Sequence, residues 1–363
     1  MHNPFPDGAD STRPFIIAGP CAAESERQVL DIAKALNPEH VHLFRAGLWK
    51  PRTRPGSFEG VGEIGLKWLQ RVRDEIGIHV TTEVARASHV ELSLKHGIDA
   101  LWIGARTSTN PFAVQELAEA LKGVDVSVFV KNPVNPELEL WIGAVERFAK
   151  VGVKRLGAIH RGFSFYGPTL YRNKPHWEIP IEFRRRMPNI PLLTDPSHIC
   201  GRRDLIYSVA QKALDLGFDG LMIETHTNPD AALSDKRQQL TPEAFSQLLC
   251  KLAVRKHEVA DPLSKHSLEK LRAVIDGIDE KLLDAIAERM AEVDKVGEVK
   301  KENGVAIYQP ERWTDVRENV KQWAEEKGLS VDLMLKLYEV IHKESIRRQS
   351  NVIHGKGQPT EQK

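Results

Sequence analysis

The chain has 363 residues with a formal charge of +1 at pH 7, and 41% of its residues are hydrophobic. This composition is typical of a globular protein of about two domains and argues against a nucleic-acid-binding surface. No stretch reaches the ~20 apolar residues of a membrane span, the first residues lack an export signal and the cysteines are far apart, so we expect a reduced, cytoplasmic protein without membrane contact.

Eight short apolar runs precede residue 225, and helical patterns fill most of the gaps between them. The runs are FIIAG at 15, HVHLFR at 40, HVTTE at 79, ALWIG at 100, SVFVK at 127, RLGAI at 155, PLLTD at 191 and GLMIE at 220. Because these runs are too apolar to have one wet face, they indicate a parallel sheet covered by helices. Eight such units predict a (β/α)8 TIM barrel, with a doubly wound open sheet as the alternative.

Polar residues follow the runs, at the ends where a barrel of parallel strands places its active site. The cations among them are Arg45, Lys50, Arg52, Arg106, Lys131 and Arg161. The other polar residues there include Glu83, His160, Asp195 and His226. One such cation alone is best explained as a solvated loop charge. Six at equivalent positions predict a cationic bowl that holds more than one phosphate or carboxylate, since guanidinium and ammonium groups suit those ligands.

A further group at these ends offers ligand atoms for a metal. Cys21 follows the first run, His198 follows the seventh, Glu224 ends the eighth, and Asp235 lies shortly beyond it. One thiolate, one imidazole and two carboxylates suit a single divalent ion such as Mn, Fe, Co or Zn. The spacing is not a local metal motif, so this prediction depends on the barrel.

After residue 254 the strand signals stop. RKHEVADPLSKHS is typical of a linker, and the apolar spacing after it predicts one helix over about 266–302, ~55 Å long. Two further helices are predicted over about 311–327 and 331–353. By periodicity alone this region is a coiled coil or a dimerisation arm.

Two polar pairs in this region favour a binding site instead. Arg289 and Lys300 lie three turns apart on one helix face, and Ser345 and Gln349 lie one turn apart on another. A cationic pair that faces a neutral polar pair suits a small dianion.

Several motifs in the first part of the chain carry a resemblance to a known family. They are GPCAAES at 19, RAGLWKPRTRPGSF at 45, IGAR at 103, VKNP at 130, HRGF at 160, DPSH at 195 and IETHTNPDAALSDKRQQL at 223. Over about residues 15–254 the chain resembles the type I 3-deoxy-D-arabino-heptulosonate 7-phosphate (DAHP) synthases, β subgroup. The related 3-deoxy-octulosonate 8-phosphate synthases share GPC but carry an Asn-Arg motif where KPRT stands here, which favours erythrose 4-phosphate as the sugar.

The resemblance implies roles for individual residues. It makes Cys21, His198, Glu224 and Asp235 the ligands of one metal ion per barrel. It implies that phosphoenolpyruvate is bound by Arg45, Lys50, Arg106, Lys131 and Arg161. It implies that erythrose 4-phosphate is bound by Lys50, Pro51, Arg52 and Thr53. Lys50 belongs to both substrate sets and is therefore our candidate for the catalytic proton transfer.

The C-terminal segment LRAVIDGIDEKLLDAIAERMAEVDKVGEVK, with PERW and ESIRRQ, resembles the all-helical chorismate mutases over about residues 266–353. The resemblance implies that chorismate and prephenate are bound by Arg272, Arg289, Lys300, Arg312, Ser345 and Gln349. Among these, Arg289, Lys300 and Gln349 would be catalytic. Trp313 and Gln309 depart from the pattern, because relatives commonly carry an acidic residue at each position.

We therefore expect a bifunctional shikimate-pathway enzyme. It would have a synthase barrel over 1–254, a linker over 255–265, a mutase domain over 266–353 and a polar tail over 354–363. The alternative is a synthase whose helical region is a catalytically weak or silent module for dimerisation and effector binding.

The positions of two arginines predict the assembly. Arg272 and Arg289 lie ~25 Å apart along one helix, so a single helix cannot bring both to one small substrate. Arg272 must then come from a second chain, which predicts an intertwined homodimer of three-helix domains. Because little chain precedes the first run, we expect the mutase pocket to be the site where prephenate inhibits the synthase.

Overall fold

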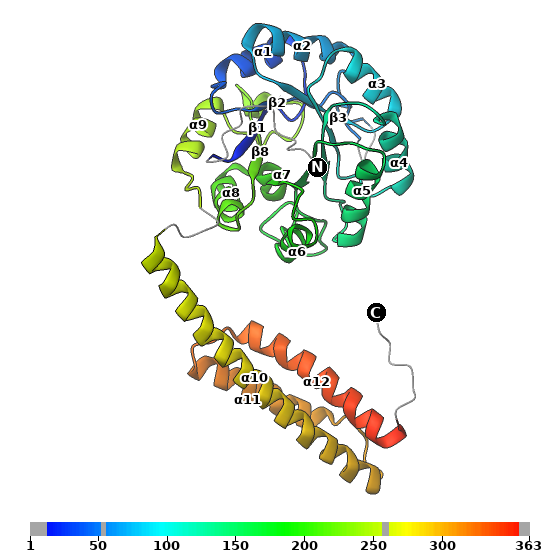
Figure 1. The fold of residues 1–363 in the computed structure, drawn as a ribbon, viewed down its shortest axis with the longest axis vertical. Helices are drawn as coiled ribbons and strands as arrows, with labels where there is room; N and C mark the ends of the chain where they lie inside the picture. The colour runs from blue at the N-terminus through cyan, green and yellow to red at the C-terminus, as the bar shows by residue number, and fades with distance from the viewer. Residues whose placement is uncertain (1–12, 52–55, 256–260, 356–363) are drawn as a thin grey trace. The chain divides into compact units, whose positions relative to one another are not determined.

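The structure is a computed structural model that describes residues 13–51, 56–255 and 261–355. The chain forms two compact units, Met1–His257 and Glu258–Lys363. Figure 1 shows the first unit as a ring of helices around the strands and the second as a bundle of helices.

The eight strands of the first unit are parallel and close into a barrel in chain order, which confirms the predicted architecture and excludes the open sheet. They are β1 Phe15–Gly19, β2 Leu43–Arg45, β3 Val80–Val84, β4 Ala100–Ile103, β5 Ser127–Lys131, β6 Leu156–His160, β7 Leu192–Thr194 and β8 Gly220–Glu224. β1 pairs with β8 from Phe15 opposite Gly220 to Gly19 opposite Glu224, and this pairing closes the barrel.

Helices cover the outside of the barrel (Figure 1). They are α1 Glu26–Ala35, α2 Ile64–Ile76, α3 Ala87–Lys95, α4 Pro111–Ala120, α5 Leu138–Lys150, α6 Glu178–Arg186, α8 Ile206–Asp215 and α9 Pro242–Lys251. The short helix α7 Pro196–Cys200 and the 3-10 turn η1 Arg203–Leu205 lie between β7 and α8, and the 3-10 turn η2 Pro229–Ala231 lies between β8 and α9. The main apolar core lies between these helices and the outer faces of the strands.

A second, smaller core fills the barrel itself. It consists of Phe15, Ile17, Leu43, Ala100, Trp102, Phe129, Ile159, Leu193 and Met222. Since side chains alternate across a strand, the residue two positions after each interior side chain also points inward. This period of two decides which polar residues at the strand ends face the barrel mouth.

The second unit contains α10 Pro262–Glu302, α11 Pro310–Glu326 and α12 Val331–His354, and α12 packs against both of the others. The three predicted helices are thus present. α10 begins before the expected residue 266 because Asp261 caps it, with its side chain accepting the Ser264 N–H at 2.8 Å, and Pro262 occupies the first helical turn.

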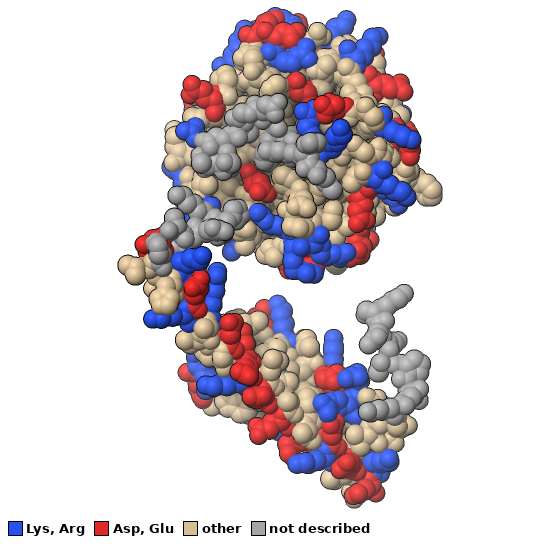
Figure 2. All heavy atoms as spheres, viewed as in Figure 1, with Lys and Arg blue, Asp and Glu red and all other residues tan. Residues whose placement is uncertain are grey.

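The first half of α10 exposes apolar side chains. Leu271, Ile275, Ile278 and Leu282 are each exposed by 50–63%. Figure 2 shows Lys, Arg, Asp and Glu mixed over the face in view, in line with the near-neutral charge. Among the described helices we find none with both the length and the apolar character needed to cross a membrane.

Candidate active sites

Polar side chains form a layer directly above the apolar interior of the barrel. Arg45 follows Leu43 by two residues, Lys131 follows Phe129, and Arg161 follows Ile159. Asp195 and Glu224 stand in the same relation to Leu193 and Met222. All five polar residues are buried. The strand period therefore brings predicted anion-binding and metal-binding residues together at one end of the barrel.

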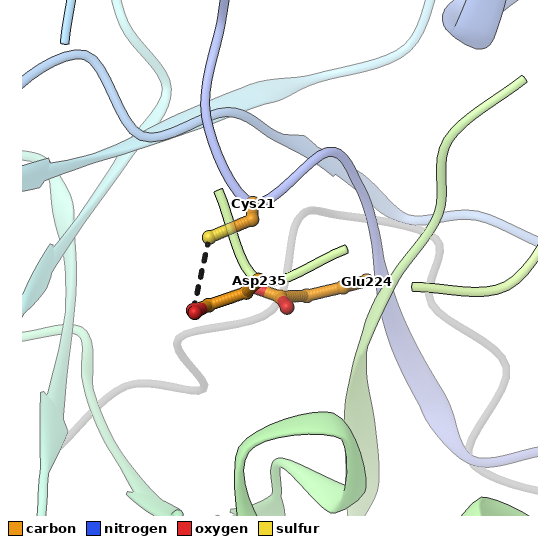
Figure 3. Close-up of side chains that lie close together, drawn as sticks. All are labelled: Cys21, Glu224 and Asp235. Atoms are coloured by element: carbon orange, nitrogen blue, oxygen red, sulfur yellow. Dashed lines mark hydrogen bonds between the residues drawn. The ribbon is translucent and has the colours of Figure 1, made fainter. Parts of the chain in front are cut away.

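Three of the four predicted metal ligands lie together. One ligand atom from each of Cys21, Glu224 and Asp235 falls within 4.8 Å of the others, as Figure 3 shows. The Cys21 thiol donates a hydrogen bond to Asp235 Oδ2 at 3.4 Å. Asp235 has φ 48°, a left-handed conformation that Asp tolerates better than most residues. The backbone is thus bent to present this carboxylate.

The fourth predicted ligand, His198, faces the same two carboxylates. Its Nε2 lies 3.8 Å from Glu224 Oε1 and 3.7 Å from Asp235 Oδ2. Its Nδ1 lies 2.8 Å from Asp195 Oδ2, and Asp195 also caps α7, the short helix that carries His198. A carboxylate behind a histidine ring fixes its orientation and leaves the other nitrogen for a metal.

The chemistry of this group fits a divalent cation. Burial, and then the charge of Glu224, raises the pKa of the Cys21 thiol to about 12 although the charges of Lys50 and Arg45 lower it, so ionisation at neutral pH needs a directly bound cation. Glu224 Oε1 is buried and accepts no hydrogen bond from the described residues. A carboxylate oxygen that accepts no hydrogen bond, beside a thiol and an imidazole, suits a transition metal.

Three buried cations lie beside this group. Arg45 Nη2 lies 3.2 Å from Glu224 Oε1, while Nε and Nη1 of Arg45 have no hydrogen-bond partner among the described residues. Lys131 Nζ lies 2.7 Å from Asp195 Oδ2, and burial lowers the lysine pKa. Burial also lowers the pKa of Arg161 to about 10, which leaves it charged at neutral pH. The unsatisfied Arg45 donors in particular suit an anion.

Lys50 is held against Cys21. Its Nζ donates to the Cys21 backbone oxygen and lies 3.4 Å from Cys21 Sγ. Gly47 makes this approach possible, because a Cβ there would lie 2.4 Å from Lys50 Nζ and 2.8 Å from Cys21 O. Pro51 is partly buried next to it, whereas Arg52 and Thr53 lie outside the described residues.

Other polar residues from the strand ends lie in different surroundings. Arg106 is exposed, and its charge contributes to the lowered pKa of Arg161. His160 packs against Trp177 and Phe218 and contacts Pro175 O at 2.7 Å through Nε2. Burial lowers the pKa of His160 to about 3. One residue before Arg161, it has the opposite strand parity and so belongs to the outer core.

The sequence analysis missed four polar residues around the metal group. Arg172 and Asn173 lie in the loop between β6 and α6, and Gln238 and Gln239 follow Asp235. Gln239 Oε1 accepts the Cys21 N–H at 3.0 Å. None of the four ends a strand, so the strand-end rule could not find them; the Gln pair shares the SDKRQQL motif with Asp235.

The helical unit brings Arg289, Ser345 and Gln349 together. Arg289 Nη1 donates to Ser345 Oγ at 2.8 Å, and Ser345 and Gln349 are buried. The buried Gln349 Oε1 has no hydrogen-bond partner among the described residues. Lys300, on the same helix as Arg289, donates to Ile307 O at 2.6 Å. Arg289 and Ser345 therefore meet between α10 and α12, whereas Lys300 contacts the segment that follows α10.

Arg272 and Arg312 are exposed, and Arg272 lies on the first half of α10, away from Arg289. Trp313 stacks on His342 with ring centroids 3.9 Å apart. Burial lowers the pKa of His342, and the charges of Arg289 and Lys300 lower it further. His342 is thus a neighbour of the pocket that the sequence analysis missed, although it lies one turn before Ser345 on the same face.

Comparison with known families agrees with both resemblances. Residues 6–260 match the model of the DAHP synthetase I family, and residues 271–350 match that of chorismate mutase type II. A phospho-2-dehydro-3-deoxyheptonate aldolase of Thermotoga maritima is 32% identical over 234 residues, covering 64% of this chain and 67% of the relative. A 2-dehydro-3-deoxyphosphooctonate aldolase of Vesicomyosocius okutanii is 26% identical over 253 residues, covering 65% and 88%.

Two solved structures are similar to this chain. The crystal structure of a T. maritima phospho-2-dehydro-3-deoxyheptonate aldolase (DAHP synthase) has a TM-score of 0.60 and 28% identity, covering 69% of this chain and 72% of that one. A truncated form of the T. maritima 3-deoxy-D-arabino-heptulosonate 7-phosphate synthase has a TM-score of 0.58 and 26% identity, covering 69% and 90%.

Proposed function

Because the chain belongs to the DAHP synthetase I family and carries a chorismate mutase type II domain C-terminal to it in sequence, we propose how its two sites perform the two reactions of this bifunctional shikimate-pathway enzyme. The barrel condenses phosphoenolpyruvate with erythrose 4-phosphate, giving DAHP and phosphate. The helical unit rearranges chorismate to prephenate. The observation that carries the barrel assignment is the group of Cys21, Glu224 and Asp235 beside the unsatisfied donors of Arg45.

In the barrel, the cations hold the enol phosphate while the aldehyde approaches. Arg45, Lys131 and Arg161, joined by Arg106 from the rim, neutralise its carboxylate and phosphate. Carbon 3 of phosphoenolpyruvate attacks the aldehyde carbon, water adds to carbon 2, and phosphate leaves. Lys50 gives the proton to the aldehyde oxygen as it becomes a hydroxyl.

We assign the metal to Cys21, His198, Glu224 and Asp235. When bound, a divalent ion such as Mn, Fe, Co or Zn would supply Lewis-acid polarisation of the aldehyde oxygen. Asp195 holds the His198 ring, and the apolar barrel interior lies directly below the group. The β-subgroup assignment remains part of this proposal.

In the helical unit, no nucleophile or general base is needed, because the rearrangement is pericyclic. Arg289, with Arg312 and an Arg272 from a second chain, holds the two carboxylates in the folded conformer. Lys300 and Gln349 stabilise the charge that develops on the ether oxygen, and Ser345 completes the pocket. The exposed apolar first half of α10 supports a homodimer, since a second chain would cover it.

We further propose that prephenate in the helical pocket inhibits the barrel. A ligand can do this only if it binds one arrangement of the protein better than another, so prephenate and the barrel substrates must oppose each other in binding. The alternative, a helical unit that binds effectors without rearranging chorismate, is supported by Trp313 and Gln309, which replace acidic residues.

The assignment is tested by assaying the intact chain with each pair of substrates. We expect phosphate release from phosphoenolpyruvate with erythrose 4-phosphate to exceed that with arabinose 5-phosphate by at least about 100-fold in kcat/KM. Chorismate should disappear at an enzymatic rate in the same preparation. Faster turnover of arabinose 5-phosphate would overturn the sugar assignment, and a background chorismate rate would favour the effector-binding alternative.

A further inference from the structure

Two adjacent residues connect the metal group with the anion-binding group. Arg172 and Asn173 lie in the loop between β6 and α6 and run beside α7, the helix that carries His198. Their backbone N–H groups donate to Cys200 O at 3.3 Å and to Ile199 O at 3.1 Å. The dipeptide is therefore fixed by its backbone, independently of what its side chains do.

Arg172 holds one oxygen of a predicted metal ligand. Its Nη1 lies 2.9 Å from Asp235 Oδ1 and donates to Gln238 Oε1 at 2.7 Å. The other Asp235 oxygen, Oδ2, is the one that lies 3.4 Å from Cys21 Sγ and 3.7 Å from His198 Nε2. Arg172 thus leaves Oδ2 facing the other predicted ligands.

Gln238 extends the same arrangement to the second carboxylate. Its Nε2 donates to Glu224 Oε2 at 2.7 Å. The remaining oxygen, Oε1, accepts no hydrogen bond from the described residues and lies 3.2 Å from Arg45 Nη2 and 3.8 Å from His198 Nε2. In both carboxylates, one oxygen is held by the Arg172–Gln238 pair and the other is directed into the metal group.

Asn173 makes the connection to the anion-binding side. Its Oδ1 accepts from Arg161 Nη1 at 2.7 Å, and its Nδ2 donates to His198 O at 2.6 Å. Asn173 is buried, so neither contact is exchanged easily with water. One amide therefore fixes a cation assigned to phosphoenolpyruvate relative to the helix of a metal ligand.

We propose that Arg172 and Asn173 are positioning residues that orient Asp235 and Glu224 for a single metal ion and tie Arg161 to His198. The inference rests on the proposed metal-dependent condensation, but it concerns side chains that touch neither substrate nor metal. Arg172 and Gln238 would increase the affinity for the metal, whereas Asn173 would support the binding of both the metal and phosphoenolpyruvate. Partners behind metal ligands typically contribute 10–100-fold in metal affinity.

Metal binding is measured directly, by titrating the metal-free full chain with Co²⁺ and following the thiolate-to-cobalt absorption. We expect Arg172→Met, which keeps the side-chain stem and removes the guanidinium, to weaken Co²⁺ binding about 10–100-fold. Gln238→Leu should weaken it in the same direction. The matched control is Arg202→Met, which removes an exposed guanidinium from an ion pair with Asp204 in the segment after α7 and should leave the affinity unchanged.

Asn173→Ala separates the two roles. It should raise the KM for phosphoenolpyruvate about tenfold and also weaken Co²⁺ binding, whereas Arg172→Met should act mainly on the metal. If Arg172→Met does not fold, Arg172→Lys keeps the charge on a shorter side chain without the guanidinium that contacts Asp235 and Gln238, and weakening in the same direction is expected.

The outcomes distinguish this inference from the proposed function. The Cys21→Ser variant lacks the thiolate and should show no cobalt-thiolate absorption. If the parent protein shows none either, the metal site itself is refuted. A parent that binds Co²⁺ while Arg172→Met and Gln238→Leu bind it equally well would overturn the positioning role alone. If Asn173→Ala leaves the KM for phosphoenolpyruvate unchanged, Asn173 does not position Arg161 for phosphoenolpyruvate binding.

Discussion

Lys131 Nζ and Asp195 Oδ2 lie 2.7 Å apart in the buried layer above the barrel core. Burial raises the pKa of Asp195, but His198 and Lys131 outweigh this and hold it well below its usual range. The Asp195 carboxylate thus contacts both Lys131, which we assign to the phosphoenolpyruvate site, and His198, which we assign to the metal site.

Replacing Asp195 by Asn should destabilise the barrel. Asn still caps α7 but leaves Lys131 as an uncompensated buried charge, so we expect the free energy of unfolding to fall by about 3 kcal/mol. Urea denaturation measures this loss. Asp204→Asn, which breaks the exposed pair with Arg202, is the control and should change it little. Equal effects of the two substitutions would contradict the buried pair's importance.

His160 should make the barrel sensitive to mild acid. Its pKa is about 3 in the folded protein and about 6.5 when unfolded, so the unfolded state binds more protons between these values. Stability must therefore fall as the pH drops below ~6.5, by up to ~1.4 kcal/mol per pH unit. His160→Gln keeps a donor for Pro175 O but cannot titrate.

Urea denaturation at pH 7 and pH 5.5 checks this. The loss of stability between the two should be smaller in His160→Gln by about 1 kcal/mol. The exposed His40→Gln provides the control. An identical loss in the parent and in His160→Gln would show that the ring can become protonated without leaving its site.

Chelation should separate the two activities. Exhaustive EDTA treatment removes the proposed ion from Cys21, His198, Glu224 and Asp235, so DAHP formation should stop and return on addition of Mn²⁺. Chorismate turnover should persist throughout, because the proposed chorismate pocket binds its substrate with arginine and lysine side chains and not with a metal ion. Unchanged DAHP formation in fully chelated protein, checked by elemental analysis, would contradict the metal assignment.

Arg289→Ala should abolish most chorismate turnover. Arg289 is the arginine that contacts Ser345 in the pocket, and losing a charged contact of several kcal/mol lowers the rate by roughly 10²- to 10⁴-fold. The exposed Arg347, on the same unit and paired with Glu344, provides the control, and Arg347→Ala should retain the parent rate. A near-parent rate in Arg289→Ala would place the pocket elsewhere.

The shared pocket is tested by mixing two inactive variants. In a heterodimer of Arg272→Ala and Arg289→Ala chains, one of the two pockets contains both arginines. Random exchange of chains should therefore restore about a quarter of the parent rate, since about half of the dimers are mixed. No recovery after exchange, or a fully active monomer in sedimentation, would contradict the intertwined dimer.

Prephenate should inhibit DAHP formation through the helical pocket. We expect inhibition of the intact chain, loss of inhibition in a chain that ends near Val254, and loss in full-length Arg289→Ala, which keeps the whole helical unit. DAHP formation is measured against prephenate concentration in all three. Equal inhibition of all three proteins would place the prephenate site in the barrel, and no inhibition of the intact chain would refute the feedback.

The barrel could be predicted from the sequence because burial on both faces makes its strands nearly continuous apolar runs. The same runs located Arg45, Lys131, Arg161 and Glu224, which lie at strand ends. Arg172 and Asn173 could not be found in this way, since their positions depend on a long loop that folds back on α7. His160 shows the limit of the rule, because a strand end has two faces and only one of them points into the barrel.

The two-residue step from the interior core to the polar layer also limits how such a chain can change in length. Deleting one residue between Leu43 and Arg45 would move the guanidinium to the helix-covered side and bring an apolar neighbour to the barrel mouth. A one-residue deletion would likewise turn Lys131, two residues after Phe129, and Glu224, two residues after Met222, to the helix-covered side. Insertions and deletions should therefore accumulate in the loops after the site residues, while the spacing inside each strand stays invariant over evolution.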